Sequence, residues 1–175
     1  MMTSAAATHS IRWKAATTPA GTTVWRTPPA LYSALDQEFA FTLDVAADED
    51  NAQCDRFFDR EADALGQTWA GESVFCNPPY GRDLERWLRK AETEARDNGA
   101  TVVMVLPART GNRWFHRYVL GRAEVRFIEG RLGFTLGGAG RARAPFDSMV
   151  VVFYPGEGGC SALRAQPTFP GFPRN

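Results

Sequence analysis

One short stretch, Asn77-Pro78-Pro79-Tyr80, sharply limits the local conformation of the chain. Its two consecutive prolines hold φ at about −65° and remove two backbone donors. Pro78 also keeps Asn77 out of the helical region. The apolar residues 73–76 come directly before this stretch, and a helical pattern starts soon after it. We therefore expect a buried strand, then a stiff extended turn, then a helix.

The groups in this turn suit a planar amine. The side-chain oxygen of Asn77 and the carbonyl of Pro78 can accept its two N–H bonds, and the ring of Tyr80 can stack on it. Open α/β sheets bind their ligands at the carboxyl ends of strands, which is where this turn is expected. The alternative is a strand-to-helix turn without any chemistry.

Apolar strands alternate with helical patterns, which predicts an α/β fold with a doubly wound, mostly parallel sheet. Residues 101–106 are nearly all apolar, as in a strand covered on both faces. No helical pattern separates the last strands, so we expect an antiparallel pair at one edge of the sheet. The other expected elements are a helix with Thr27 as its N-cap and Pro28 as its first residue, a central strand over 41–47, a turn over 61–66, a helix over 84–98, a helix from Trp114 to Gly121, strands over 123–128, 130–136 and 148–154, and a loop over 137–144.

The chain has 175 residues, which suits one domain with a proper core. We expect a flexible arm over 1–20, the folded domain over 21–155 and an irregular, Gly- and Pro-rich segment over 156–175. No apolar run approaches the roughly 20 residues that span a bilayer, and the first residues lack the apolar core of a signal peptide. A cytoplasmic protein that does not bind membranes is expected, as a monomer or a weak dimer.

The cysteines and histidines indicate neither a disulfide framework nor a metal site. There are three widely spaced cysteines and two histidines, with no CxxC pair. Such spacing disfavours a structural zinc site. We therefore expect no metal.

The net charge is zero, but the charges are unevenly distributed. Residues 36–63 contain ten Asp or Glu and two Arg, whereas residues 109–143 contain eight Arg and two Glu. Arginine pairs with phosphate in a bidentate fashion and stacks on bases. The basic second half therefore favours a polyanionic partner, with an ordinary solvated surface as the alternative.

A second candidate site lies earlier in the chain, at Asp44-Val45-Ala46-Ala47. An acid at a strand end, followed by small residues, allows a nucleotide-like ligand to approach the backbone, and the carboxylate can bind an ammonium or a hydroxyl. No GxG accompanies this strand, which disfavours a dinucleotide site. Asp63, expected at the same edge of the sheet, could accept an adenine amino group. The alternatives are a surface or N-cap acid for Asp44 and a turn-capping acid for Asp63.

Taken in order, these stretches resemble the S-adenosylmethionine-dependent amino methyltransferases. They are most similar to the small phage-type DNA N6-adenine methyltransferases, the Dam-like family. The resemblance covers about residues 25–153 and rests on Trp25-Arg26-Thr27-Pro28-Pro29, Leu43-Asp44-Val45-Ala46-Ala47, Asp63, 74–82, 103–109, 130–134 and 144–152. It implies a Rossmann-like three-layer sandwich. Residues 45–47 depart from the wider methyltransferase pattern, in which a glycine-rich loop is usual.

The resemblance also implies a cofactor half of the site. Thr27 and Pro28 would line the methionine carboxylate of S-adenosylmethionine. Asp44 would meet its amino group, with Ala46 allowing close contact. Asp63 would bind its adenine. The acid that holds the ribose stays open between two candidates, Asp55 and Asp59.

The target half would consist of Asn77, Pro78 and Tyr80, which hold and stack the adenine, with Pro79 beside them. Phe134 is a candidate for the other wall of the pocket, or else a core residue. The candidate contacts to DNA phosphates are Arg82, Arg109, Arg113 and Arg131. Because no strong base is needed to methylate such an amine once its hydrogens are bound, the absence of His and Cys from the motif is consistent with direct transfer.

Three other functions use the same residues. The turn could hold an RNA base or the amide of a protein glutamine, or the chain could bind nucleic acid with a vestigial site. The arginine content favours nucleic acid over a protein amide. The chain leaves little room for a separate target-recognition domain, so a short or relaxed DNA target is expected.

Overall fold

The computed structural model describes residues 25–136, 140–156 and 163–165. The arm expected over 1–20 lies outside the described residues. The helices are α1 (Pro29–Phe39), α2 (Leu84–Asn98) and the π-helix η1 (Phe115–Val119). The strands are β1 (Trp25–Arg26), β2 (Leu43–Asp44), β3 (Ser73–Cys76), β4 (Thr101–Pro107), β5 (Glu124–Phe127), β6 (Gly133–Leu136), β7 (Gly140–Arg143), β8 (Ser148–Phe153) and β9 (Leu163–Ala165).

In the described part of the chain, the main sheet has six strands in the order β2-β3-β4-β8-β5-β9. β2, β3 and β4 pair in parallel, and β9 is parallel to β5. β8 is antiparallel to both of its neighbours, β4 and β5. The predicted α/β class with a mostly parallel sheet is therefore confirmed.

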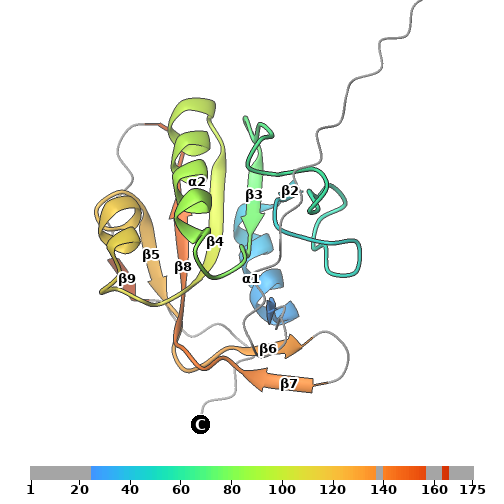
Figure 1. Cartoon of the computed structure of the whole chain (residues 1–175), viewed down its shortest axis with the longest axis vertical. Coiled ribbons are helices and arrows are strands. Elements are labelled where there is room, and N and C mark those ends of the chain that lie inside the picture. The colour runs from blue at the N-terminus through green and yellow to red at the C-terminus, as the bar shows by residue number, and fades with distance from the viewer. Residues whose placement is uncertain (1–24, 137–139, 157–162, 166–175) are drawn as a thin grey trace, which may run out of the picture.

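Helices cover both faces of this sheet (Figure 1). Val102 and Met104 of β4 face one core, which also includes buried residues of α2 and η1. Val103 and Val105 face the other core, with Leu31 and Leu35 of α1. Because successive side chains of a strand point to opposite faces, this alternation places α2 and η1 on one side and α1 on the other. The prediction that residues 101–106 are covered on both faces is confirmed.

Helix α2 follows the predicted periodicity. Its buried residues, spaced for one helical face, are Leu84, Trp87, Leu88, Ala91, Glu94 and Ala95. The helix ends at Gly99, which adopts the left-handed conformation with φ of 72°. Glycine takes this conformation without the steric penalty of a Cβ atom, which explains the sharp end of the helix.

A second, three-stranded sheet in the order β1-β6-β7 lies beyond the end toward which β3 points (Figure 1). β6 and β7 form an antiparallel pair, and β1 is antiparallel to β6. β7 occupies part of the segment 137–144, so the expectation of a loop there is wrong for residues 140–143. This small sheet brings β1, and the residues that follow it, to the edge at which β3 ends.

The main sheet contains antiparallel pairs, but the prediction that they lie at its edge is wrong. β8 lies inside the sheet, between β4 and β5. β5 is followed by the β6 and β7 strands instead of a helix, so the chain re-enters the sheet from the same edge and β8 must run backwards. β9 then adds to the outer side of β5. The segment 156–175 was expected to be irregular, and this expectation is wrong for residues 163–165, which form β9.

Three local expectations also differ from the structure. β2 is limited to Leu43–Asp44 and is the outermost named strand, with one parallel bridge from Asp44 to Phe57 on its outer side, so it is not central. Pro28, not Thr27, occupies the N-cap position of α1, and Pro29 is the first helical residue. The helix expected from Trp114 is the short π-helix η1, which is followed by a left-handed Gly121.

Candidate active site

The two candidate stretches lie side by side at the carboxyl edge of the main sheet. Asp44 of β2 is paired in register with Phe75 of β3, and the Val45 N–H donates to the Phe75 carbonyl at 3.1 Å. Asn77 follows two residues after Phe75, so it comes just beyond Asp44 along the same edge. This arrangement follows from parallel pairing, which brings the carboxyl ends of neighbouring strands together.

The Asn77 side chain contacts two other candidate residues. Its Nδ2 donates to Thr27 Oγ1 at 3.0 Å, across 50 positions of sequence. Its Oδ1 accepts from the Tyr80 hydroxyl at 2.9 Å. That hydroxyl also lies 3.2 Å from the Val105 carbonyl of β4. The amide is thus fixed between the start of α1 and the neighbouring strand.

Tyr80 is enclosed at its hydroxyl end, and burial raises its pKa well above the ordinary value, which keeps it protonated. The ring of Phe146 lies edge to face with that of Tyr80, with 5.6 Å between the ring centroids. Phe146 was given no role from the sequence, although it stands within the family pattern at 144–152. Only the fold reveals that it lies against the turn, because 66 residues separate the two rings along the chain.

Asp44 is the most buried acid of the site, with 3% of its surface exposed. Its Oδ1 accepts from the Ala46 N–H at 3.2 Å, and its Oδ2 accepts from the Gln53 N–H at 3.1 Å. Burial raises its pKa to about 6, although the two N–H bonds oppose this shift. Among the described residues, no Lys or Arg forms a salt bridge with Asp44. The carboxylate therefore suits a small cationic group.

Asp63 lies in a turn that is anchored to the core. Its φ of 46° is left-handed, an uncommon conformation for a residue other than glycine. One carboxylate oxygen, Oδ1, is buried and has no hydrogen-bond partner among the described residues. The next residue, Ala64, accepts from the buried indole N–H of Trp69 at 3.0 Å. A buried oxygen without a partner is costly, and a ligand that donates a hydrogen bond would remove this cost.

The remaining cofactor candidates differ in their surroundings. Pro28 is buried, and its carbonyl accepts the first N–H bonds of α1, from Leu31 and Tyr32. Ala46 is partly buried beside Asp44. Asp59 Oδ1 already accepts two backbone N–H bonds of its own turn, whereas Asp55 is exposed.

Sequence reasoning also missed Arg26. Its Nη1 donates to the Asp50 carbonyl at 3.0 Å, which links β1 to the loop after β2. Its Nε is buried and has no hydrogen-bond partner in the part of the chain that the structure describes. It precedes Thr27 directly, yet an isolated Arg beside the Thr-Pro pair carried no separate signal in the sequence.

The arginine candidates fall into two groups. Arg82 follows the turn, Arg109 follows β4, and both are exposed at the edge of the site. No salt bridge within the described residues involves Arg82, Arg109 or Arg113. Arg131 differs, because its Nε lies 3.8 Å from Asp147 Oδ1. Pro79 is exposed, while Phe134 lies in β6 with its side chain outside the described part of the structure.

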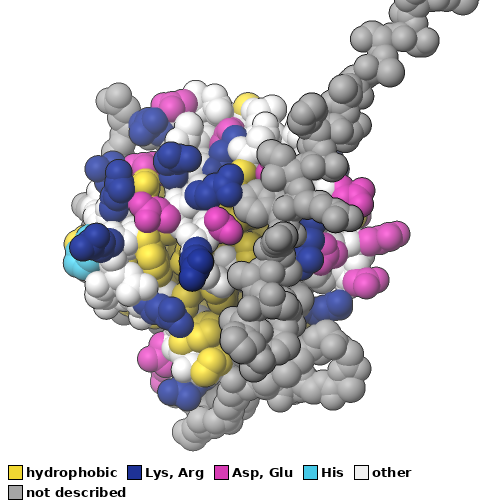
Figure 2. Space-filling view, viewed as in Figure 1, with side chains coloured by type: hydrophobic (Ala, Val, Ile, Leu, Met, Phe, Trp, Pro, Cys, Tyr) yellow, Lys and Arg dark blue, Asp and Glu magenta, His cyan; other side chains and the backbone are white. Residues whose placement is uncertain are grey.

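Figure 2 shows that basic side chains also gather over α2 and η1, whereas acidic ones project from the loop after β2. Several of the basic residues on the α2 face are paired with acids. Arg117 meets Glu85 at 3.2 Å, and Arg122 meets Glu92 at 2.7 Å. This face is therefore of mixed charge, as on an ordinary solvated helix.

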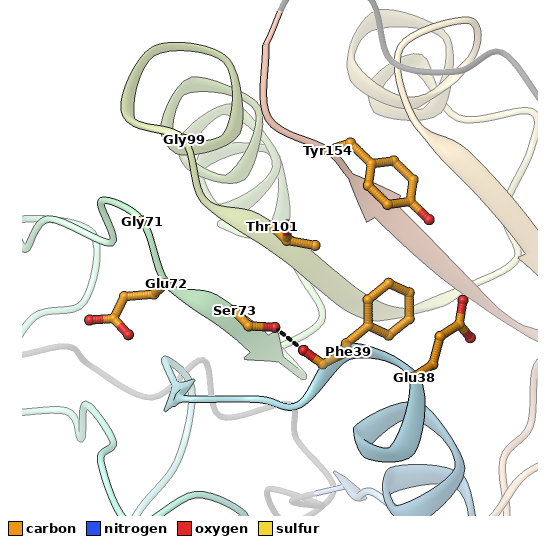
Figure 3. A pocket seen from close by; sticks show the side chains of 8 residues that line it. All are labelled: Glu38, Phe39, Gly71, Glu72, Ser73, Gly99, Thr101 and Tyr154. Atoms are coloured by element: carbon orange, nitrogen blue, oxygen red, sulfur yellow. Dashed lines mark hydrogen bonds between the residues drawn. The ribbon is translucent and has the colours of Figure 1, made fainter.

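A surface pocket lies at the opposite edge of the sheet (Figure 3). Ser73 and Thr101, the first residues of β3 and β4, line it together with Tyr154 after β8. Its two acids are already paired, Glu38 with Arg126 and Glu72 with Arg56. This pocket is thus separate from the candidate site. Within the described residues, no group of three or more His, Cys, Asp or Glu suits a metal ion, and no helix is long and apolar enough to cross a membrane.

Comparison with known proteins identifies the family of this chain. A family model described as DNA N-6-adenine-methyltransferase (Dam) matches residues 14–157 of the 175. The chain belongs to the Dam family. The resemblance inferred from the Asn-Pro-Pro-Tyr turn and its flanking patterns is therefore confirmed.

Two relatives illustrate the similarity of this chain to known proteins. A DNA N-6-adenine-methyltransferase of Escherichia phage T1 is 32% identical over 149 residues, covering 75% of this chain and 62% of that protein. A protein of Escherichia coli strain K12 named "Putative methyltransferase YfdM" is 35% identical over 63 residues, covering 32% of this chain and 69% of that protein. The chain thus spans about three fifths of the length of the phage relative.

Proposed function

We propose that this chain transfers a methyl group from S-adenosylmethionine to the exocyclic N6 amine of adenine in DNA, on a Rossmann-like methyltransferase fold. The observation that carries the proposal is the Asn77 amide, which Thr27 and Tyr80 hold at the sheet edge next to the buried Asp44. Membership of the Dam family supports the same reaction, as does the name of the phage relative, a DNA N-6-adenine-methyltransferase.

The residues present fit the cofactor at two points. Asp44 is a buried carboxylate bonded to backbone N–H groups, so the ammonium of the methionine portion would compensate its charge. Asp63 has a buried oxygen that no group within residues 25–136, 140–156 and 163–165 hydrogen-bonds, which suits the amino group of the cofactor adenine. Thr27 and Pro28 would line the carboxylate, and Ala46 would allow close approach. When bound, the cofactor supplies an activated methyl group on its sulfonium.

The turn supplies the groups that activate the target. The N6 amine is a poor nucleophile because its lone pair is delocalised into the ring. Asn77 Oδ1 and the Pro78 carbonyl would each accept a hydrogen bond from one of its two N–H groups. These two bonds would favour a pyramidal nitrogen and stabilise the positive charge that develops on it. An amide oxygen can accept two hydrogen bonds, and the Tyr80 hydroxyl donates one to Asn77 Oδ1. The raised pKa of Tyr80 argues against its acting as a base.

Adenine in a duplex must leave the base stack before it reaches this turn, at a cost of a few kcal/mol. Stacking on the Tyr80 ring would offset about 1–3 kcal/mol of that cost. Arg82 and Arg109 are exposed at the same edge and would contact phosphates, with Pro79 beside the base. These contacts would hold the strand while the base is extruded.

The decisive experiment offers radiolabelled S-adenosylmethionine together with DNA, RNA or protein in parallel, followed by nucleoside analysis. We expect label in N6-methyladenine from DNA. Label in RNA, or in a protein glutamine, would show that DNA is not the substrate. Absence of both transfer and cofactor binding at millimolar concentration would contradict the enzymatic function.

Asn77→Ala is expected to retain cofactor binding but to lose transfer by about 100-fold or more, since it removes an acceptor aimed at developing charge. Single-turnover methylation and calorimetric titration of S-adenosylhomocysteine measure the two quantities. Asn98→Ala is the matched control, because Asn98 ends α2 at the far edge of the sheet. Transfer by Asn77→Ala at the rate of the control would remove Asn77 from the mechanism.

A further inference from the structure

The structure gives Thr27 a partner that its place in the sequence does not suggest. Its side chain is buried, with 6% of the residue surface exposed, and its Oγ1 lies 3.0 Å from Asn77 Nδ2. The residue is held from both sides, because β1 directly before it pairs with β6 and α1 starts two residues after it. Its hydroxyl is therefore a fixed point against which the amide can be oriented.

The orientation of the Asn77 amide matters because its two ends have opposite properties. Oδ1 accepts hydrogen bonds and Nδ2 donates them, so only Oδ1 can bind an amine hydrogen of the target. In the structure Nδ2 faces Thr27 and Oδ1 faces the Tyr80 hydroxyl at 2.9 Å. The second contact of that hydroxyl, with the Val105 carbonyl at 3.2 Å, ties this end of the network to β4.

A hydroxyl both donates and accepts, so Thr27 by itself can face either end of an amide. The Thr27 hydroxyl loses this freedom once its O–H donates to another group, because its oxygen can then only accept a hydrogen bond from the amide. The amide nitrogen must then face it, and Oδ1 is directed to the opposite side. A hydroxyl that donates to an anion is also a stronger acceptor, so the contact with Nδ2 would tighten.

We propose that Thr27 is a positioning residue that couples the two substrates of the reaction. Its O–H donates to the carboxylate of the bound cofactor, and its oxygen accepts from Nδ2 of Asn77, so cofactor binding sets the orientation of the amide that receives the target amine. This inference rests on the proposed function. Beyond that function, the Thr27 hydroxyl makes the orientation of the Asn77 amide depend on the bound cofactor.

The first test compares four variants in steady-state methylation of a DNA duplex. Thr27→Ala and Thr27→Ser both lose the methyl group, and only Thr27→Ala loses the hydroxyl. Thr27→Val removes the hydroxyl at nearly constant volume. Thr101→Val is the matched control, because Thr101 starts β4 at the opposite edge of the sheet.

We expect Thr27→Val and Thr27→Ala to reduce kcat by about 3- to 10-fold, as for one hydrogen bond of ordinary net strength, with little change in KM for DNA. Thr27→Ser should restore most of the loss. If Thr27→Val fails to fold, the Ala and Ser pair still isolates the hydroxyl. Equal kcat for those two variants would overturn the proposal. A wild-type protein that transfers no methyl group would instead refute the proposed function.

The second test measures the coupling directly. The affinity for a duplex containing an unpaired adenine is measured by fluorescence anisotropy with and without saturating S-adenosylhomocysteine. The wild type should bind this duplex more tightly with the cofactor product, and Thr27→Ser should keep most of that gain. Thr27→Ala should lose it. The same gain in Thr27→Ala as in the wild type would contradict coupling through the hydroxyl.

Discussion

At the scale of single residues, Asp44 is the side chain whose chemistry depends most on its surroundings. It is 3% exposed, and burial raises its pKa to about 6. An α-ammonium titrates near pH 8 (about 7.7–8.0), so it stays charged while Asp44 changes its ionisation between pH 7 and pH 5. Only the ionised carboxylate attracts the ammonium, so affinity for the cofactor should fall as the pH falls.

We expect the affinity of the wild type for S-adenosylhomocysteine to be about tenfold weaker at pH 5 than at pH 7, because about a tenth of the free Asp44 carboxyls are ionised at pH 5. Isothermal titration calorimetry at several pH values measures this. Asp44→Asn should bind more weakly at pH 7 and show little pH dependence over this range. A wild-type affinity that stays constant down to pH 5 would show that Asp44 does not bind the ammonium.

At the scale of elements, a buried Arg126 on β5 ties the main sheet to α1. Its Nε contacts Glu124 Oε1 at 2.7 Å, and its Nη1 contacts Glu38 Oε2, near the end of α1, at 2.6 Å. The guanidinium also lies over the Phe39 ring, 5.2 Å from its centroid. Glu124 in turn accepts from the Tyr154 hydroxyl at 3.0 Å. Arg126 thus contacts Glu124, Glu38 and Phe39 directly, and Tyr154 joins the network through Glu124.

Arg126→Met should destabilise the fold by about 3–5 kcal/mol, because the buried Glu124 carboxylate would lose its counter-charge. For a chain of this length we expect the melting temperature to fall by about 6 °C or more. Arg122→Met is the matched control, since Arg122 pairs with Glu92 at the surface and such a pair is worth about 1 kcal/mol or less. Similar melting temperatures for the two variants would contradict a supporting role for the network.

At the scale of the whole molecule, the charges are separated along the chain but only partly on the surface. The face over α2 and η1 mixes acids with basic side chains (Figure 2). Arg82 follows the Asn-Pro-Pro-Tyr turn and Arg109 follows β4, and both are exposed. If these two residues contact phosphates, each should contribute about one unit to the slope of log affinity against log salt concentration.

Arg82→Gln and Arg109→Gln should therefore weaken DNA binding to a similar degree for all sequences, and each should reduce the salt slope by about one. Anisotropy titrations of a labelled duplex at several salt concentrations measure this. Arg96→Gln is the control, because Arg96 lies in the last turn of α2, toward the opposite edge of the sheet. An unchanged slope in either site variant would exclude that residue as a phosphate contact.

Most of the framework that positions the site could be predicted from residues close together in sequence. The apolar spacing of α2 and the apolar run of β4 both predict their elements, because periodicity and burial are local patterns. Register and strand order could not be predicted in this way. The position of β8 between β4 and β5 depends on the path of the chain through β6 and β7, which no local pattern encodes.

The sequence by itself determined the stiff Asn-Pro-Pro-Tyr turn after a strand, because proline restricts φ wherever it stands. It also pointed to the family and to the residue types that a planar amine requires. Only the tertiary structure decided what holds this turn. Thr27 reaches Asn77 across 50 positions, and Val105 reaches Tyr80 across 25. Hydrogen bonds between such distant residues depend on the packing of the sheet, so local patterns could not reveal them.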